Sequence, residues 1–391
     1  MNKKLLAVAI AGAFSVPVAM ADTSNVTIYG VINMSVDSVD GGSGDGTSAG
    51  AATSERRTRI SSNNSNIGFK GTEDLGNGLS AIWQFETAIG WDTNGLVGNA
   101  NTTTGAIGAG SDSIGVIGQR NTFAGFSSKT LGALTFGNQE SPMKTAIGAL
   151  DMFGNTIADY RTLMGPQTRM ASSALYVTPN LSGFSAKLGY SARNEAGNDS
   201  TSGSVADPSY WSGNVTYSNG PIFAALAYEE EKTVSSTILS TKQKTTRAGF
   251  GYNFGVAKVG LGWNSTKLST NASGATTNAK VNSWMLSGAY TMGKTTLKAQ
   301  YVKSGDTSGD AASATASSQG AKQWTLGADY AMSKRTNLYA LYTQLSNDSN
   351  SSRALGNNGT VLGANTGVAT VTAASAGQDP KAISVGFVHK F

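Results

Sequence analysis

Along most of the chain, apolar and polar side chains alternate with a period of two residues. In segment 184–191, for example, Phe184, Ala186, Leu188 and Tyr190 alternate with serine, lysine and glycine. This is the period of a β-strand, whose successive side chains point to opposite faces of a sheet. The pattern, stronger or weaker, recurs in about sixteen segments: 26–37, 57–70, 79–91, 119–128, 132–139, 171–179, 184–191, 209–218, 221–231, 246–254, 259–264, 281–292, 297–302, 324–330, 336–346 and 383–391. The chain is therefore predicted to be all-β.

The connections between these segments alternate between short turns and long loops. The short turns lie at 73–78, 128–132, 178–183, 218–221, 253–257, 291–295 and 332–336. The long stretches, rich in Gly, Ser, Thr, Asn and Ala, lie near 38–56, 92–118, 140–170, 194–208, 230–245, 268–280, 304–321 and 346–380. A soluble sandwich has no reason to gather every long loop at one end, whereas an outer-membrane barrel has short periplasmic turns and long external loops. We therefore predict a 16-stranded antiparallel transmembrane β-barrel.

The two ends of the chain fit such a barrel. Residues 1–21 read as a secretory signal peptide, with Lys3 and Lys4, an apolar run and a small-x-small cleavage site that ends at Ala21. Residues 22–391 would then form a single barrel domain. Segments 26–37 and 383–391 are expected to pair, because an open sheet edge cannot face hydrocarbon. The carboxyl-terminal Phe391 would lie where aromatic girdles form, and sixteen strands would enclose an aqueous channel.

Composition and charge exclude several other classes of protein. The chain has no cysteine, so it has neither a disulfide framework nor a thiolate metal site. After residue 21 no apolar run is long enough for a transmembrane helix. The formal charge of +5 falls to +3 without the two signal-peptide lysines. That excess is too small, and too scattered, to indicate a nucleic-acid partner.

Four stretches resemble the general porins of the β-proteobacterial type, the trimeric group that includes the Neisseria and Bordetella porins. They are VTIYGVINMSV (26–36), SNIGFKGTEDLGNGLSAIWQFE (65–86), YVTPNLSGFSAKLGYS (176–191) and VGFVHKF (385–391). The resemblance implies a homotrimer in the cell outer membrane, in contact with lipid and lipopolysaccharide, that passes small hydrophilic solutes and ions. It also implies a third loop folded into the pore, no cofactor and no metal. The terminal Phe391 resembles the assembly signal that the barrel-assembly machinery reads.

The resemblance also indicates the residues of a pore constriction. Relatives often place basic residues on the wall opposite the inward loop, which correspond here to Arg120 and Arg169. At a third such position this chain has Asn66 in place of arginine, which weakens the expected anion preference. The loop should run over about 140–170, beginning near Glu140 and including DMFG at 151–154.

Independently of any family, a loop that carries Asp151 and Asp159 and faces wall arginines would set a transverse field across a narrow aqueous neck. Strand parity adds further lumen residues with a basic surplus, which favours a weak anion preference: Lys70, Lys187, Arg247, Lys258 and Lys298 against Asp37, Glu86, Glu229 and Asp329.

Two other classes of function remain open at this point. A barrel hydrolase needs an accessible histidine beside a serine and a carboxylate. His389 is the only histidine, and alternation places it on the outer face with Phe391, so no catalytic residue is expected. A structural or adhesive barrel would have a plugged lumen and would conduct nothing. The preferred interpretation is a passive diffusion channel and not an enzyme.

Overall fold

The computed structural model describes residues 25–41, 56–92, 95–96, 118, 120–165, 169–191, 209–236, 239–272, 274–310, 318–356 and 376–391. The expected signal peptide and most of the first, second, fourth and eighth long loops lie outside these residues. None of the helices that the structure describes is long and apolar enough to cross a bilayer.

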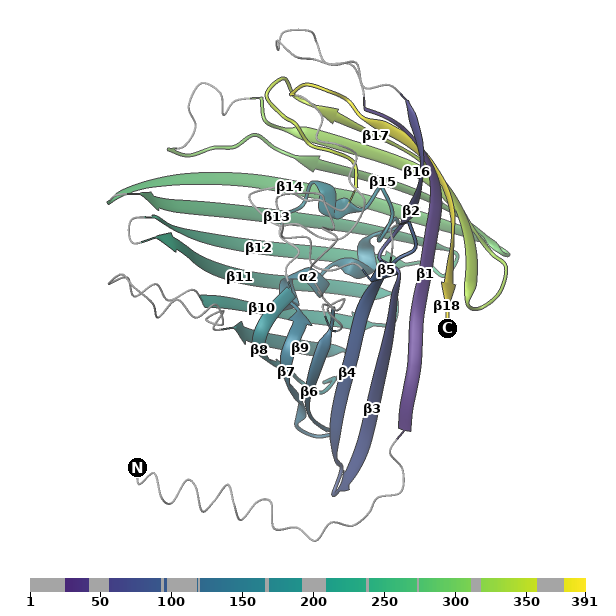
Figure 1. Cartoon of the computed structure of the whole chain (residues 1–391), viewed down its shortest axis with the longest axis vertical. Coiled ribbons are helices and arrows are strands. Elements are labelled where there is room, and N and C mark those ends of the chain that lie inside the picture. The colour runs from purple at the N-terminus through teal and green to yellow at the C-terminus, as the bar shows by residue number, and fades with distance from the viewer. Residues whose placement is uncertain are drawn as a thin grey trace, which may run out of the picture.

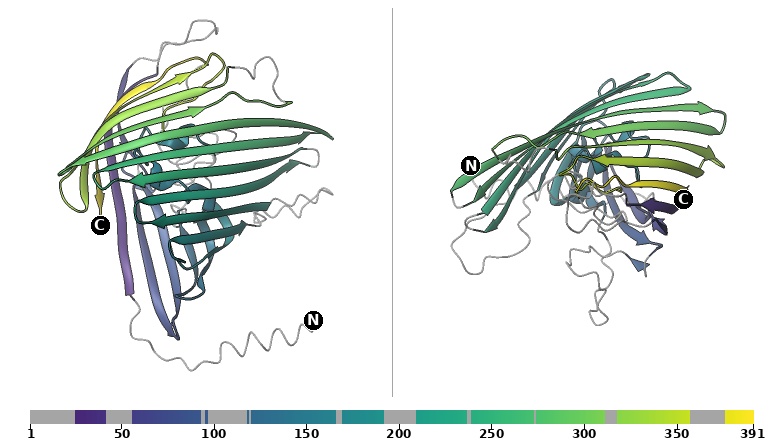
Figure 2. Two further views of the ribbon diagram at one scale, coloured as in Figure 1. Left: turned by 180° about the vertical axis from the view of Figure 1, so that it is seen from behind. Right: turned by 90° about the horizontal axis from the view of Figure 1, so that it is seen from above.

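The described strands form one closed antiparallel sheet (Figures 1 and 2). The bounds are β1 (Asn25–Asp40), β2 (Arg57–Ser62), β3 (Asn66–Gly76), β4 (Leu79–Gly90), β5 (Gly95–Leu96), β6 (Thr122–Ser128), β7 (Gly132–Glu140), β8 (Arg169–Val177), β9 (Phe184–Ser191), β10 (Ser209–Asn219), β11 (Ile222–Ser236), β12 (Leu239–Asn253), β13 (Ala257–Ala272), β14 (Ala275–Met292), β15 (Thr295–Ser304), β16 (Ala321–Ala331), β17 (Thr336–Asn347) and β18 (Lys381–Lys390).

Over the residues that the structure describes, the wall consists of sixteen strands, as predicted. Strands β2 and β3 both pair with β1, above and below a break at 63–65, so together they make one strand of the wall. Among the described residues, the two-residue β5 pairs with the end of β4 alone and adds no strand to the wall. Counting β2 and β3 as one strand and leaving out β5 reduces the eighteen described strands to sixteen.

The predicted seam between the first and last strands is present. β1 pairs with β18 from Val31 opposite Lys390 to Asp40 opposite Lys381. Beyond β18, Phe391 exchanges two backbone hydrogen bonds with Gly30, at N–O distances of 3.0 and 3.1 Å. The Phe391 ring covers Gly30, where a Cβ atom would lie 2.5 Å from the ring. Closure leaves none of the described strands with an edge that faces the membrane.

The outer surface of the barrel is apolar and aromatic. Leu226, Leu261, Leu286 and Leu326 are each more than half exposed there. Neighbouring strands place Trp263 opposite Trp284 and Tyr301 opposite Trp324 on the same face. Such an apolar band with aromatic residues at its edge is the surface that faces lipid in outer-membrane barrels.

The prediction of long loops near 230–245 and 268–280 is wrong. Near 230–245 and 268–280, strands β11 to β14 continue almost to the hairpin tips, and β11 ends at Ser236 while β12 begins at Leu239. The physical reason is that these strand ends carry polar residues on both faces. The hydrophobic alternation that reveals a strand therefore stops well before the backbone ladder does.

Candidate pore constriction

The connection between β7 and β8 enters the barrel instead of leaving it. Its described part contains three short helices, α2 (Pro142–Thr145), η1 (Gly148–Leu150) and η2 (Tyr160–Thr162). Figures 1 and 2 show these helices inside the ring of strands. Ser141 caps α2 by accepting a hydrogen bond from Lys144 N at 3.1 Å. This third long connection, residues 141–168, is called the inner loop below.

The underside of the inner loop packs against the barrel wall through buried apolar side chains. Ile147 and Phe153 are almost fully buried. The wall beneath them is glycine, because a Cβ atom at Gly249 would lie 2.5 Å from Ile147 and one at Gly327 would lie 2.8 Å from Phe153. The main apolar core of this barrel therefore lies between the inner loop and the wall.

Polar wall residues hold the inner-loop backbone in place. The fully buried Arg247 donates to the carbonyl oxygens of Met143 at 3.1 Å and Met164 at 2.7 Å. Ser283 Oγ donates to Leu163 O at 2.9 Å, and Ser287 Oγ donates to Leu150 O at 2.6 Å. Buried carbonyl groups need such partners, so these contacts fix the path of the loop across the lumen.

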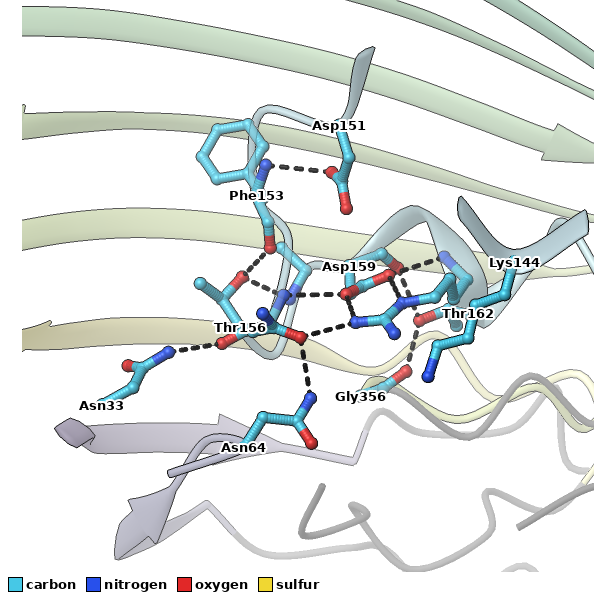
Figure 3. Close-up of polar contacts among 12 residues, drawn as sticks. Asn33, Asn64, Lys144, Asp151, Phe153, Thr156, Asp159, Thr162 and Gly356 are labelled. Atoms are coloured by element: carbon cyan, nitrogen blue, oxygen red, sulfur yellow. Dashed lines mark hydrogen bonds and ion pairs between the residues drawn. The ribbon is translucent and has the colours of Figure 1, made fainter. Parts of the chain in front are cut away.

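The far end of the inner loop is organised around Asp159 (Figure 3). This fully buried carboxylate accepts from the backbone N–H of Asn155 at 2.8 Å and of Arg161 at 2.9 Å, and it pairs with the Arg161 guanidinium. Asn33 on β1 donates to Asn155 O at 2.8 Å, and Thr162 bonds the carbonyl of Gly356. The loop end is thereby tied to both the first strand and the last long connection.

The pore-facing side of the inner loop and the adjoining wall line an open pocket of about 440 Å³. Four cationic and two acidic residues take part in its lining, which comprises Asn64, Arg120, Glu140, Lys144, Thr145, Gly148, Ala149, Asp151, Gly154, Asn155, Tyr160, Arg161 and Arg169. Charged side chains of the inner loop and of the wall at β6 to β8 therefore converge on one part of the lumen.

Most of these charges are paired. Arg120 Nε lies 2.5 Å from Glu86 Oε1 on β4, and Arg120 Nη1 donates to Asn64 Oδ1 at 3.3 Å. Glu140 is shared by Lys144 at 2.8 Å and Arg169 at 3.1 Å. Arg120, Lys144 and Arg169 therefore form ion pairs with carboxylates and still line the pocket.

Four of the predicted site residues lie together and three do not. Arg120, Arg169, Glu140 and Asp151 line the pocket, the last also accepting from Phe153 N at 3.0 Å. Asp159 lies beneath the surface of the pocket, where its carboxylate forms an ion pair with Arg161.

The two predicted residues of β3 are also outside the lining. Asn66 is buried, and its amide donates to Asn64 O at 3.1 Å. Lys70 is exposed farther along β3, with its ammonium 5.3 Å from the centre of the Tyr29 ring.

Sequence reasoning missed Lys144 and Arg161 as lining residues. Both stand in the segment expected to form the loop, but the site residues predicted there are all acidic: Glu140, Asp151 and Asp159. The inner loop therefore brings the cations Lys144 and Arg161 to the pocket, and the wall brings the carboxylate of Glu140 together with Arg120 and Arg169. The separation of an acidic loop from a basic wall is less complete than expected.

Two inner-loop groups have ionisation shifted toward neutral pH. Burial lowers the pKa of Lys144 to about 8, although the adjacent Glu140 acts in the opposite direction. Burial together with the nearby Asp159 raises the pKa of Asp151 to about 7. Both groups border the pocket, so its net charge depends on pH within the ordinary range.

A profile of the family described as Gram-negative porin matches residues 6–350. The chain belongs to this porin family. It is 29% identical to the outer membrane porin protein 32 of Delftia acidovorans over the full length of both chains. It is 30% identical to a major outer membrane protein P.IB of Neisseria meningitidis serogroup B, over 86% of this chain and 91% of that relative.

The fold agrees with this assignment. The anion-selective porin from Comamonas acidovorans superposes with a TM-score of 0.69 at 25% identity, over 94% of this chain and all of that one. The protein is therefore an outer-membrane porin, a 16-stranded channel and not an enzyme. Consistently, His389 lies on the outer face, where its Nδ1 is 2.9 Å from the Thr336 hydroxyl.

Proposed function

We propose that this porin is a passive diffusion channel with a weak preference for small hydrophilic anions, and that the pocket above the inner loop makes the selection. The observation that carries the proposal is the convergence of four cations, Arg120, Lys144, Arg161 and Arg169, on one pocket. The carboxylates of Glu86 and Asp159 pair with two of these cations from behind, with side chains 9% and 0% exposed. A permeating ion therefore meets the basic groups first.

The preference should be weak, because nearby carboxylates offset most of the positive charge. Glu140 faces the pocket between Lys144 and Arg169, and Asp151 lies on the inner loop. The similarity to the Comamonas acidovorans porin, which is anion-selective, supports the sign of the proposal.

The test is the zero-current potential of the purified protein in a planar bilayer under a KCl gradient. Arg120→Ala and Arg169→Ala should each lower the chloride preference, because each removes one positive charge and leaves Glu86 or Glu140 less compensated. Arg335→Ala is the matched control, since it removes the same charge from the exposed turn between β16 and β17. A potassium preference that neither variant changes would refute the selectivity assignment, whereas absence of conductance would indicate a plugged barrel.

We also propose that the protein works as a homotrimer that the barrel-assembly machinery inserts by reading the terminal strand with Phe391. OmpT of Vibrio cholerae, a barrel of the same fold with a TM-score of 0.63 at 15% identity, occurs in a trimer form. A wide apolar outer surface is compatible with packing around a symmetry axis. The surrounding lipid would include lipopolysaccharide.

A further inference from the structure

A row of lysines crosses the outer face of the barrel near its long-loop end. Its members are Lys244 on β12, Lys267 on β13, Lys280 on β14, Lys303 on β15 and Lys322 on β16, and all five are exposed. Figures 1 and 2 show these strands side by side. The five residues are called the lysine row.

The strand register places like charges directly opposite one another in this row. Lys267 is the partner of both Lys244 and Lys280, and Lys303 is the partner of Lys322. Directly opposite side chains have Cβ atoms about 5 Å apart, and like charges in such pairs destabilise a sheet. Three such pairs in one row indicate that something outside the chain supplies the compensating negative charge.

Carboxylates of the described residues compensate only one end of the row. Glu230 lies 3.3 Å from Lys244 and 2.8 Å from its neighbour Lys242. Over the described part of the chain, no carboxylate lies within ion-pair distance of Lys267, Lys280, Lys303 or Lys322. The row as a whole therefore presents a positive surface to its surroundings.

The height of the row identifies those surroundings. Each lysine from Lys267 to Lys322 lies two or four residues beyond an aromatic side chain of its own strand, toward the long loops: Trp263, Trp284, Tyr301 and Trp324. Such aromatic residues mark the boundary between hydrocarbon and headgroups. Lysines just beyond that boundary reach headgroup level with their ammonium groups.

We propose that the lysine row binds the phosphate groups of lipopolysaccharide in the outer leaflet. A phosphate seated between Lys267 and either neighbour would turn a repulsive pair into two charge-assisted contacts. The aromatic residues below would contact the acyl chains of the same molecule. The inference rests on the outer-membrane location of the barrel and is independent of which ions the pore prefers.

The test uses the full-length protein refolded in detergent and fluorescently labelled lipopolysaccharide. Each lysine near an anionic lipid surface contributes about 1 kcal/mol, so Lys244→Gln, Lys267→Gln and Lys280→Gln together should weaken binding on the order of 100-fold. The milder pair Lys303→Gln and Lys322→Gln should weaken it roughly 30-fold.

The matched control replaces three exposed lysines of the short turns at the other end of the barrel, Lys129, Lys294 and Lys334, by glutamine. It should bind as the wild-type protein does, and enzymatically dephosphorylated lipopolysaccharide should bind wild type as weakly as the triple row variant. Unchanged affinity in both row variants, or equal affinity for the dephosphorylated lipid, would overturn the proposal. So would a changed number of subunits at unchanged lipid affinity, because the row would then contact a second copy of the chain.

Single-channel conductance of the same variants keeps this outcome separate from the channel function. The row lies outside the lumen, so conductance should stay at the wild-type value, which also shows that the variants fold.

Discussion

The ion preference of this porin should reverse or vanish as pH rises through the neutral range. Near pH 5.5 the pocket and its paired carboxylates carry four positive charges, on Arg120, Lys144, Arg161 and Arg169, and three negative ones, on Glu86, Glu140 and Asp159, because Asp151 with its pKa of about 7 is protonated. The sum is +1.

Near pH 9.5 Asp151 is ionised, and Lys144, with its pKa of about 8, has lost its proton. The sum of three positive and four negative charges is then −1. A carboxyl group with a raised pKa becomes negatively charged only at a higher pH than usual, and an amine with a lowered pKa loses its positive charge at a lower pH than usual. Both steps therefore act in the same direction and reduce anion preference.

The size of the effect follows from Coulomb's law. One unit charge about 6 Å from a permeating ion in water contributes roughly 0.7 kcal/mol, favourable for one sign of ion and unfavourable for the other. Two units thus shift the balance between chloride and potassium by about 2.8 kcal/mol without salt, and screening at 0.1 M reduces this to roughly 1.5 kcal/mol. The permeability ratio should change on the order of tenfold.

The assay is the zero-current potential at half-unit pH intervals from 5.5 to 9.5 in 0.1 M mean KCl. Asp151→Asn should remove the step near pH 7 and keep the step near pH 8, and Lys144→Gln should do the reverse. Lys294→Gln, in the turn between β14 and β15, should keep both steps. A flat wild-type profile, or one that neither loop variant changes, would refute the reasoning.

Two further predictions concern the scaffold and assembly. Arg247→Leu leaves the carbonyls of Met143 and Met164 without their hydrogen-bond donor, which should cost roughly 1–3 kcal/mol of stability for each carbonyl. Single-channel recordings should therefore become noisier and the melting temperature should fall. Recordings and melting identical to those of Arg335→Leu would contradict the anchoring role. Deleting Phe391 removes its two backbone bonds to Gly30, so the amount of heat-resistant trimer in cell envelopes should drop, with Phe391→Ala in between; an unchanged trimer band, or a monomer in wild type, would exclude the proposed assembly.

The strands were predictable wherever the chain crosses hydrocarbon. Lipid outside and water inside impose different side chains on alternate residues, as in β9, and this contrast is readable in one sequence. Above the membrane both faces of β13 and β14 meet water, so the contrast disappears although the ladder continues to the tip. The break between β2 and β3 left no signal either, because 57–70 reads as one alternating segment.

The candidate site was predictable only in part, because alternation assigns a face to a strand residue but not to a loop residue. Arg169 and Glu140 end two neighbouring strands and face each other in register. Lys144 and Arg161 owe their position to the path of the inner loop, which depends on distant contacts with Ser283, Ser287 and other wall residues. No local pattern encodes those contacts.

Parity also overstates how many lumen charges act on a permeating ion. Arg247 faces inward as expected, but it is fully buried beneath the inner loop, and its guanidinium donates hydrogen bonds to loop carbonyls and to Asn264. Lys298 faces inward too, and it lies 2.7 Å from Asp329. Neither residue lines the pocket. An inward-facing charge in this barrel therefore contributes to selectivity only where the inner loop leaves it in contact with pore water, so the loop decides which wall charges an ion meets.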